Sequence, residues 1–172
     1  MYNETKYAKS VKHGLKAEEK FKRIATTKNF NVQNSTIYQN KIKHIDFILC
    51  KNSENGLYKR TVDVKGVKKI NSEFTDKLIF IELQNNNGGT GWLYGDVDGF
   101  AFEMMDGSFI LVNRIDLVAK VESLIDVNKP SITTVTKKQP YVIYDRKPWD
   151  NDDRIVLITQ QDLLSLKHSK WR

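Results

Sequence analysis

The sequence is poor in cysteine, proline and long apolar runs. Among its 172 residues there are one cysteine (Cys50) and three prolines. No apolar run approaches the roughly 20 residues that a bilayer-spanning helix needs. A single cysteine excludes an internal disulfide and a zinc site built from several cysteines. Residues 1–10 carry charge without an apolar stretch behind it, unlike a secretory signal. We therefore expect a cytoplasmic protein (in the host cytoplasm if the chain is phage-encoded) with no membrane partner.

Positive charge exceeds negative charge in this chain. The 28 Lys and Arg residues outnumber the 21 Asp and Glu residues, which gives a formal net charge of +7. Such a surplus favours a polyanionic partner, because neutralised phosphates release their counterions. The same surplus also arises in Lys- and Asn-rich proteins through AT-rich coding, so both explanations stay open. The 40% hydrophobic content is enough for a folded core.

Apolar spacing predicts a helix, a run of strands, a second helix and further strands. In the first helix (residues 10–29), Leu15, Glu18, Phe21 and Ala25 are spaced to face the core. Helical spacing recurs over 115–125 and, briefly, over 160–166. Strands are expected over 35–39, 44–50, 57–66, 77–84, 92–104, 108–114, 141–146 and 154–159.

This order of elements predicts an α/β protein with a central mixed β-sheet flanked by helices. A length of 172 residues suits one domain spanning 1–172. We expect its core over about residues 10–125 and a C-terminal β-hairpin with a short helix over about residues 139–168.

Residues 60–66, RTVDVKG, read as a strand that runs into a turn. Because strand side chains alternate between faces, Asp63 and Lys65 should point one way, and Val62 and Val64 the other. A surface ion pair is the simplest interpretation of this pair. A metal-dependent active site is the alternative.

A second carboxylate is expected beside this strand. Asp46 lies in the apolar stretch HIDFILC, where an uncompensated carboxylate costs several kcal/mol. Neighbouring strands would aim Asp46 and Asp63 at one place, and Glu18 would approach from the core-facing side of the first helix. Mg²⁺ suits such a set, because it takes one or two carboxylates together with phosphate oxygens. Mg²⁺ polarises a scissile phosphate, and a lysine beside it can position water or stabilise developing charge.

The order of Glu18, Asp46 and Asp63-Val64-Lys65 resembles that of the PD-(D/E)xK nucleases. This restriction-endonuclease-like superfamily includes Holliday junction resolvases and many phage nucleases. The stretch GLKAEEKF is similar to the glycine-x-x-alanine-glutamate pattern of the resolvase-like branch, which selects Glu18. The resemblance covers residues 12–66 in detail. The chain departs from it at Ile45, where the family has proline, and at Asp63, where glutamate is commoner.

The resemblance implies a fold, a reaction and a set of roles. The fold would be a restriction-endonuclease-like core with the order α-β-β-β-α-β. The reaction would be structure-selective endonucleolytic hydrolysis of DNA, with RNA as an alternative substrate. The protein could act as a homodimer. Asp46, Asp63 and Glu18 would hold Mg²⁺, for which Mn²⁺ would substitute. Lys65 would act on the attacking water or on the transition state, so that all four residues would be catalytic.

Other residues are candidates for supporting roles. Glu82 and Gln84 either face the same site from a further strand or lie exposed on it. His44 shares the expected face of Asp46, and a surface position is its simplest interpretation. Trp92, Tyr94 and Trp149 either stack on unpaired bases or pack in the core. Phosphate contacts are expected from Lys9, Lys12, Lys16, Lys68, Lys69, Arg146 and Lys147.

Two other classes of function remain open from the sequence. One is a non-catalytic nucleic-acid-binding module that keeps the nuclease fold. The other is a structural or interaction protein, of phage origin for example, in which the acids are incidental.

Overall fold

The computed structural model describes residues 4–54, 56–132, 137–145 and 153–172, with side chains from residue 12 onward. The described chain is α/β, as the sequence predicted, with a six-stranded mixed sheet and two smaller sheets. None of its helices combines the length and apolar character needed to cross a bilayer. Its α-helices are α1 (Glu4–Thr27), α2 (Ile37–Lys43), α3 (Arg114–Leu124) and α4 (Gln160–Leu164).

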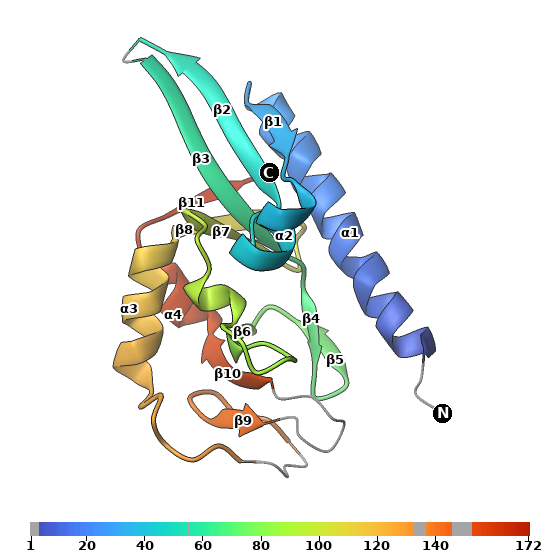
Figure 1. Cartoon of the computed structure of the whole chain (residues 1–172), viewed down its shortest axis with the longest axis vertical. Helices are drawn as coiled ribbons and strands as arrows, with labels where there is room; N and C mark the ends of the chain where they lie inside the picture. The colour runs from blue at the N-terminus through green and yellow to red at the C-terminus, as the bar shows by residue number, and fades with distance from the viewer. Residues whose placement is uncertain (1–3, 55, 133–136, 146–152) are drawn as a thin grey trace.

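The six-stranded sheet has the order β1-β2-β3-β7-β8-β11. All neighbouring strands are antiparallel except β3 and β7, which are parallel. The hairpin of β2 and β3 extends well beyond the other strands (Figure 1). The strands are β1 (Asn31–Asn34), β2 (Phe47–Ser53), β3 (Gly56–Lys65), β7 (Gly99–Glu103), β8 (Phe109–Asn113) and β11 (His168–Trp171).

The connection from β3 to its parallel neighbour β7 carries three strands of the smaller sheets and a 3₁₀ helix. A three-stranded sheet has the order β6-β10-β9, and β4 pairs with β5. The elements are β4 (Lys68–Ile70), β5 (Glu73–Thr75), β6 (Leu78–Gln84), the 3₁₀ helix η1 (Trp92–Tyr94), β9 (Ile143–Asp145) and β10 (Arg154–Thr159). The expected C-terminal strand pair and short helix are thus β9, β10 and α4.

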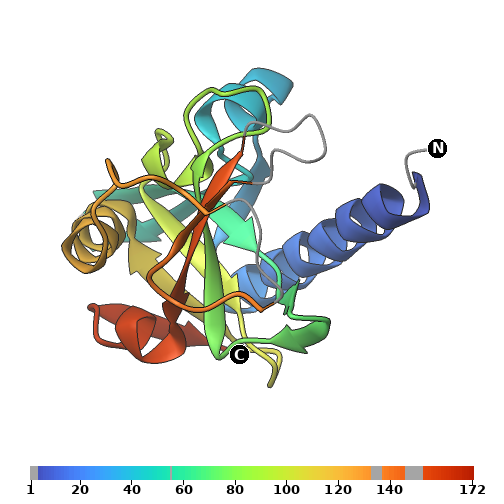
Figure 2. The same ribbon diagram turned by 90° about the horizontal axis from the view of Figure 1, so that it is seen from below.

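Helix α1 packs against one face of the large sheet. Its buried residues Ala17, Phe21 and Ala25 contact a cluster that includes Val62 and Val64 of β3. The prediction that Leu15 faces the core is wrong, because Leu15 is 55% exposed and Ala17 takes the buried position. The N-terminal end of α1 reaches out beyond the rest of the chain (Figure 2).

A second core fills the opposite face of the large sheet. It is formed by residues of the large sheet, of β6 and β10, and of α3 and η1. Trp92 of η1 is 5% exposed and lies edge-on to Phe100 of β7, with the ring centroids 4.9 Å apart. The second face of the sheet is therefore covered by strands as well as by helices.

Three local predictions are corrected by the structure. Residues 35–39 do not form a strand: Thr36 caps α2, accepting a hydrogen bond from the Gln39 amide while the Gln39 side chain accepts one from the Thr36 amide. This reciprocal pair is a capping box, which outweighs the β propensity of Ile37 and Tyr38. In the predicted strand 92–104, residues 92–94 are helical. The short strands β1, β4, β5 and β11 were not predicted.

Replacing Gly91 with alanine should destabilise the protein by about 1–3 kcal/mol. A Cβ atom at Gly91 would lie 2.4 Å from the Glu82 carbonyl oxygen, so the backbone of β6 or η1 would have to move. Gly14 in α1 is a matched control, because a Cβ there meets no atom within 4 Å. Gly14→Ala should stabilise by up to about 1 kcal/mol through helix propensity. Urea denaturation measures both changes, and equal effects of the two variants would contradict this account.

Candidate active site

Asp63 and Lys65 form a close ion pair at the end of β3. Lys65 Nζ lies 2.7 Å from Asp63 Oδ2. The two side chains leave the strand on the face opposite α1, whereas Val62 and Val64 pack toward α1, as alternation predicted. Asp63 is only 2% exposed, and the side chain of Lys65 is 20% exposed. A surface ion pair is therefore not the correct description of RTVDVKG.

Asp46 lies directly before the first residue of β2 and continues its pairing with β3. Its amide donates to the Val62 carbonyl over 3.0 Å. Its carboxylate then takes the place of the backbone carbonyl that would accept the next hydrogen bond between the strands. Oδ2 accepts a hydrogen bond of 2.7 Å from the Val64 amide. The other oxygen, Oδ1, accepts one of 2.7 Å from the Asn40 side chain. These bonds hold the Asp46 carboxylate against the strand that carries Asp63.

The electrostatics of Asp63 tie it to both of its neighbours. Burial raises the pKa of Asp63 well above its usual range, with the nearby Lys65 ammonium opposing the shift and the Asp46 carboxylate adding to it. A buried carboxylate loses the hydration of its charged form, and a second carboxylate adds repulsion.

Glu18 of α1 is electrostatically coupled to Asp46 and Lys65. Burial first, and Asp46 second, raise the pKa of Glu18 to about 7, while Lys65 lowers it. Asp46 and Lys65 thus interact electrostatically with both Asp63 at the end of β3 and Glu18 on α1.

The residues present suit Mg²⁺ better than a metal that needs a full protein cage. Among the described residues, no three His, Cys, Asp or Glu side chains are grouped as ligands of one ion. Mg²⁺ needs only one or two carboxylates, because waters and phosphate oxygens complete its shell. Asp46 and Asp63 are such a pair, and their mutual repulsion is what a divalent cation relieves. Glu18 would complete or orient the set.

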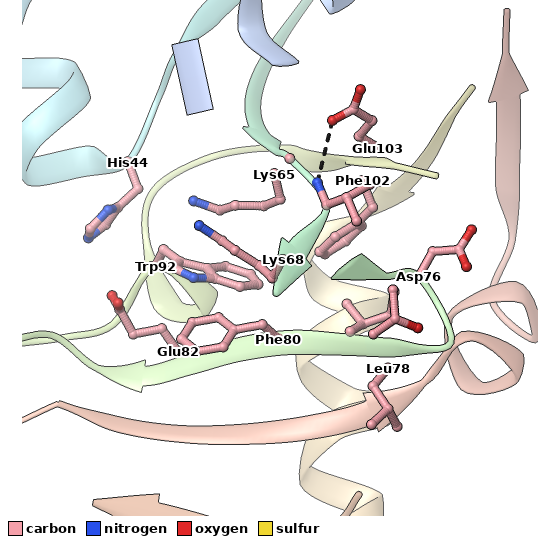
Figure 3. A pocket seen from close by; sticks show the side chains of 14 residues that line it. His44, Lys65, Lys68, Asp76, Leu78, Phe80, Glu82, Trp92, Phe102 and Glu103 are labelled. Atoms are coloured by element: carbon pink, nitrogen blue, oxygen red, sulfur yellow. Dashed lines mark hydrogen bonds between the residues drawn. The ribbon is translucent and has the colours of Figure 1, made fainter. Parts of the chain in front are cut away.

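A cavity of about 310 Å³ opens beside this group (Figure 3). Lys65 is the one member of the four that lines it; Glu18, Asp46 and Asp63 do not. Glu82 lines the cavity from β6, whereas Gln84 is not among its lining residues. Glu82 therefore faces the site from a strand of the second sheet, not from the sheet that carries Asp63.

His44 is less exposed than the simplest interpretation of the sequence predicted. It is half-buried and lines the cavity with Lys65, instead of lying on the surface. Burial and the Lys65 charge lower its pKa. Its backbone is left-handed, with φ of 55°, which ends α2 and turns the chain toward Asp46. The sequence feature that indicates this position is the spacing of two residues between His44 and Asp46, which puts both on one face of the strand expected over 44–50.

The predicted nucleic-acid contacts lie along α1 and β4. Lys12, Lys16, Lys68 and Lys69 are all exposed, and Lys68 also lines the cavity. Arg146, Lys147, Trp149 and the side chain of Lys9 lie outside the described residues.

Neither described aromatic candidate is presented as a stacking surface. Trp92 is buried, with Lys65 Nζ 4.7 Å from its ring centroid. Tyr94 donates its hydroxyl to Glu122 over 3.2 Å. The core-packing alternative holds for Trp92.

Mg²⁺ affinity should rise with pH through the neutral range. With a pKa of about 7, Glu18 is largely protonated at pH 6 and largely ionised at pH 8, and only the ionised form attracts a cation. Isothermal titration with Mg²⁺ at about pH 6 and about pH 8 measures the change. In Glu18→Gln the pH dependence should flatten. Equal wild-type affinities at both pH values would contradict the predicted role of Glu18.

Comparison with models of known protein families, with curated proteins and with solved structures finds no match to this chain.

Proposed function

We propose that this protein is a Mg²⁺-dependent nuclease that hydrolyses phosphodiester bonds of DNA. The observation that supports the proposal is the placement of Asp46 against the strand that carries the Asp63–Lys65 ion pair, with Glu18 electrostatically coupled to Asp46 and Lys65, in the chain order of the family that the sequence resembles. Perturbed carboxylates with a shared cationic partner beside a cavity are typical of catalytic sites.

Each of the four residues has a role that its surroundings suit. Asp46 and Asp63 would hold Mg²⁺, which when bound supplies Lewis-acid chemistry at the scissile phosphate. Lys65, which pairs with Asp63 and also lines the cavity, would stabilise charge that develops on the phosphate in the transition state. Glu18, with its pKa raised to about 7, would orient the set from α1 in its ionised form.

A hollow along α1 supports binding of a polyanion. This hollow of about 610 Å³ is lined by four basic residues, and Glu103 lines both it and the cavity beside Lys65. A nucleic-acid backbone can therefore contact α1 and reach the site. The basic residues of the hollow are Lys12, Lys16, Lys20 and Arg23.

Cleavage of labelled DNA tests the proposal. Single-stranded, duplex and four-way-junction DNA, with a single-stranded RNA beside them, are incubated with the protein in Mg²⁺, in Mn²⁺ and in EDTA. We expect cleavage of at least one DNA substrate with either metal and none in EDTA.

Two negative results have different meanings. Binding without cleavage of any substrate would replace the proposal with a non-catalytic nucleic-acid-binding module. Neither binding nor cleavage would leave Asp46 and Asp63 with structural roles alone, as hydrogen-bonded and ion-paired groups at the end of β3.

A further inference from the structure

The cavity beside Lys65 is lined by elements from all three sheets. The end of β3 and β4 lie on one side, β6 on the other, and His44 and η1 close one end. Figure 3 shows Lys65 and Lys68 with their ammonium groups on the same side, toward His44. Phe80 and Glu82 rise from β6 beneath them. A ligand that meets Lys65 in this cavity also meets these groups.

The size of the cavity limits what can enter it. Its volume of about 310 Å³ is at the lower end of the range for pockets that bind small molecules. Intact duplex DNA needs an extended surface, because such complexes bury roughly 1,000 Å² or more of protein. The cavity therefore suits one nucleotide taken out of a base pair, or one nucleotide of a single strand.

The chemistry of the lining suits both parts of a nucleotide. Lys65, whose ammonium also pairs with Asp63 over 2.7 Å, and Lys68 place two ammonium groups at the cavity, and Phe80 places an aromatic ring there. The lining carboxylates Glu103 and Asp76 are engaged by the protein itself. Glu103 pairs with Lys20 over 3.1 Å, and Asp76 accepts a 2.9 Å hydrogen bond from the Met105 amide. Their charge is therefore partly compensated.

We propose that this cavity binds one unpaired nucleotide, with its base against Phe80 and its phosphate at Lys65 and Lys68. The preferred nucleic acid of the site is then single-stranded instead of duplex. This inference rests on the proposed nuclease function only for the statement that the bound nucleotide is part of a substrate. Binding itself requires no cleavage.

Fluorescence anisotropy in EDTA tests the inference without cleavage. The probes are a labelled oligothymidine single strand and a labelled hairpin duplex of equal length. We expect the wild-type protein to bind the single strand at least about 10-fold more tightly. Phe80→Ala should weaken single-strand binding by about 5- to 100-fold, as loss of one stacked base does. Tyr38→Ala is the matched control, because Tyr38 is 62% exposed on α2 and does not line the cavity.

A second variant keeps the test valid if Phe80→Ala fails to fold. Lys68 is exposed, so Lys68→Met should fold and should weaken single-strand binding by about 10-fold. Lys167→Met, at another exposed lysine outside the cavity, should leave binding unchanged. Equal affinities for both probes, or variants that bind like their controls, would overturn the inference.

A cleavage assay on the same proteins separates this inference from the proposed function. Mg²⁺-dependent cutting of the duplex that Phe80→Ala does not alter would keep the nuclease and remove the nucleotide pocket. Tight, Phe80-dependent binding of the single strand without cleavage in Mg²⁺ would keep the pocket and remove the nuclease.

Discussion

Replacing Lys65 with methionine is expected to reduce Mg²⁺-dependent DNA cleavage by about 100- to 1,000-fold. Methionine keeps most of the length of the side chain but removes the ammonium group that stabilises charge at the phosphate. The buried Asp63 carboxylate also loses its ion-pair partner at 2.7 Å and is expected to take up a proton, which weakens its hold on a cation. The rate constant for cleavage under single-turnover conditions measures the loss.

Lys170→Met is the matched control for this experiment. Lys170 also pairs with a carboxylate, that of Asp106 at 2.9 Å, but it lies on β11 and does not line the cavity. Its replacement should leave the cleavage rate within about twofold of the wild type, since surface ion pairs contribute little. Full cleavage activity in Lys65→Met would remove Lys65 from the site.

Replacing Phe21 with alanine is expected to lower the free energy of unfolding by about 3–5 kcal/mol. The Phe21 side chain is fully buried beneath α1. Its ring stacks on Trp171 at a centroid distance of 5.6 Å and meets Phe109 edge-on at 5.3 Å. The change removes these contacts and leaves a cavity between α1 and the large sheet. Guanidinium denaturation, followed by circular dichroism, measures it.

Leu15→Ala on the same helix is the control for Phe21→Ala. Leu15 is 55% exposed, so its truncation should change the free energy of unfolding by no more than about 0.5 kcal/mol. A comparable loss in both variants would mean that α1 packs on a different face. The sequence pattern places both residues on one apolar face, so this pair of variants also tests the corrected helix orientation.

The hairpin of β2 and β3 could be predicted from the sequence because its determinants are local. Alternation in RTVDVKG separates the Asp63 and Lys65 side chains from Val62 and Val64, and the pairing of β2 with β3 follows from a short connection. Asp46 and Asp63 lie close together as a consequence of that pairing.

The elements that were missed or misassigned depend on contacts that are not local in the sequence, or on a cap that competes with propensity. The capping box of Thr36 and Gln39 turns a segment with β-favouring residues into α2. The strand β11 is short and largely polar, and only its pairing with β8 makes it a strand. The sheet to which β6 belongs is set by β10, far along the chain, so the direction of Glu82 could not be fixed in advance.

The cavity could not be anticipated for the same reason. His44, Lys65, Glu82 and Trp92 come from four separate segments, and their grouping depends on how the second sheet covers the first. Residue types alone favoured a surface histidine and a core tryptophan. The tertiary structure places both beside Lys65.

The pairing of β11 with β8 is expected to form late in folding. Ser169 pairs with Leu111, so this edge of the sheet closes a long loop that contains the whole β9–β10 region. Long-range pairings of this kind form late, because the chain loses loop entropy before the contacts compensate for it. The ring of Phe21 gains Trp171 as a neighbour only at that stage. Amide hydrogen exchange in β11 is therefore expected to report a local opening that uncovers the α1 side of the core while the β2–β3 hairpin stays intact.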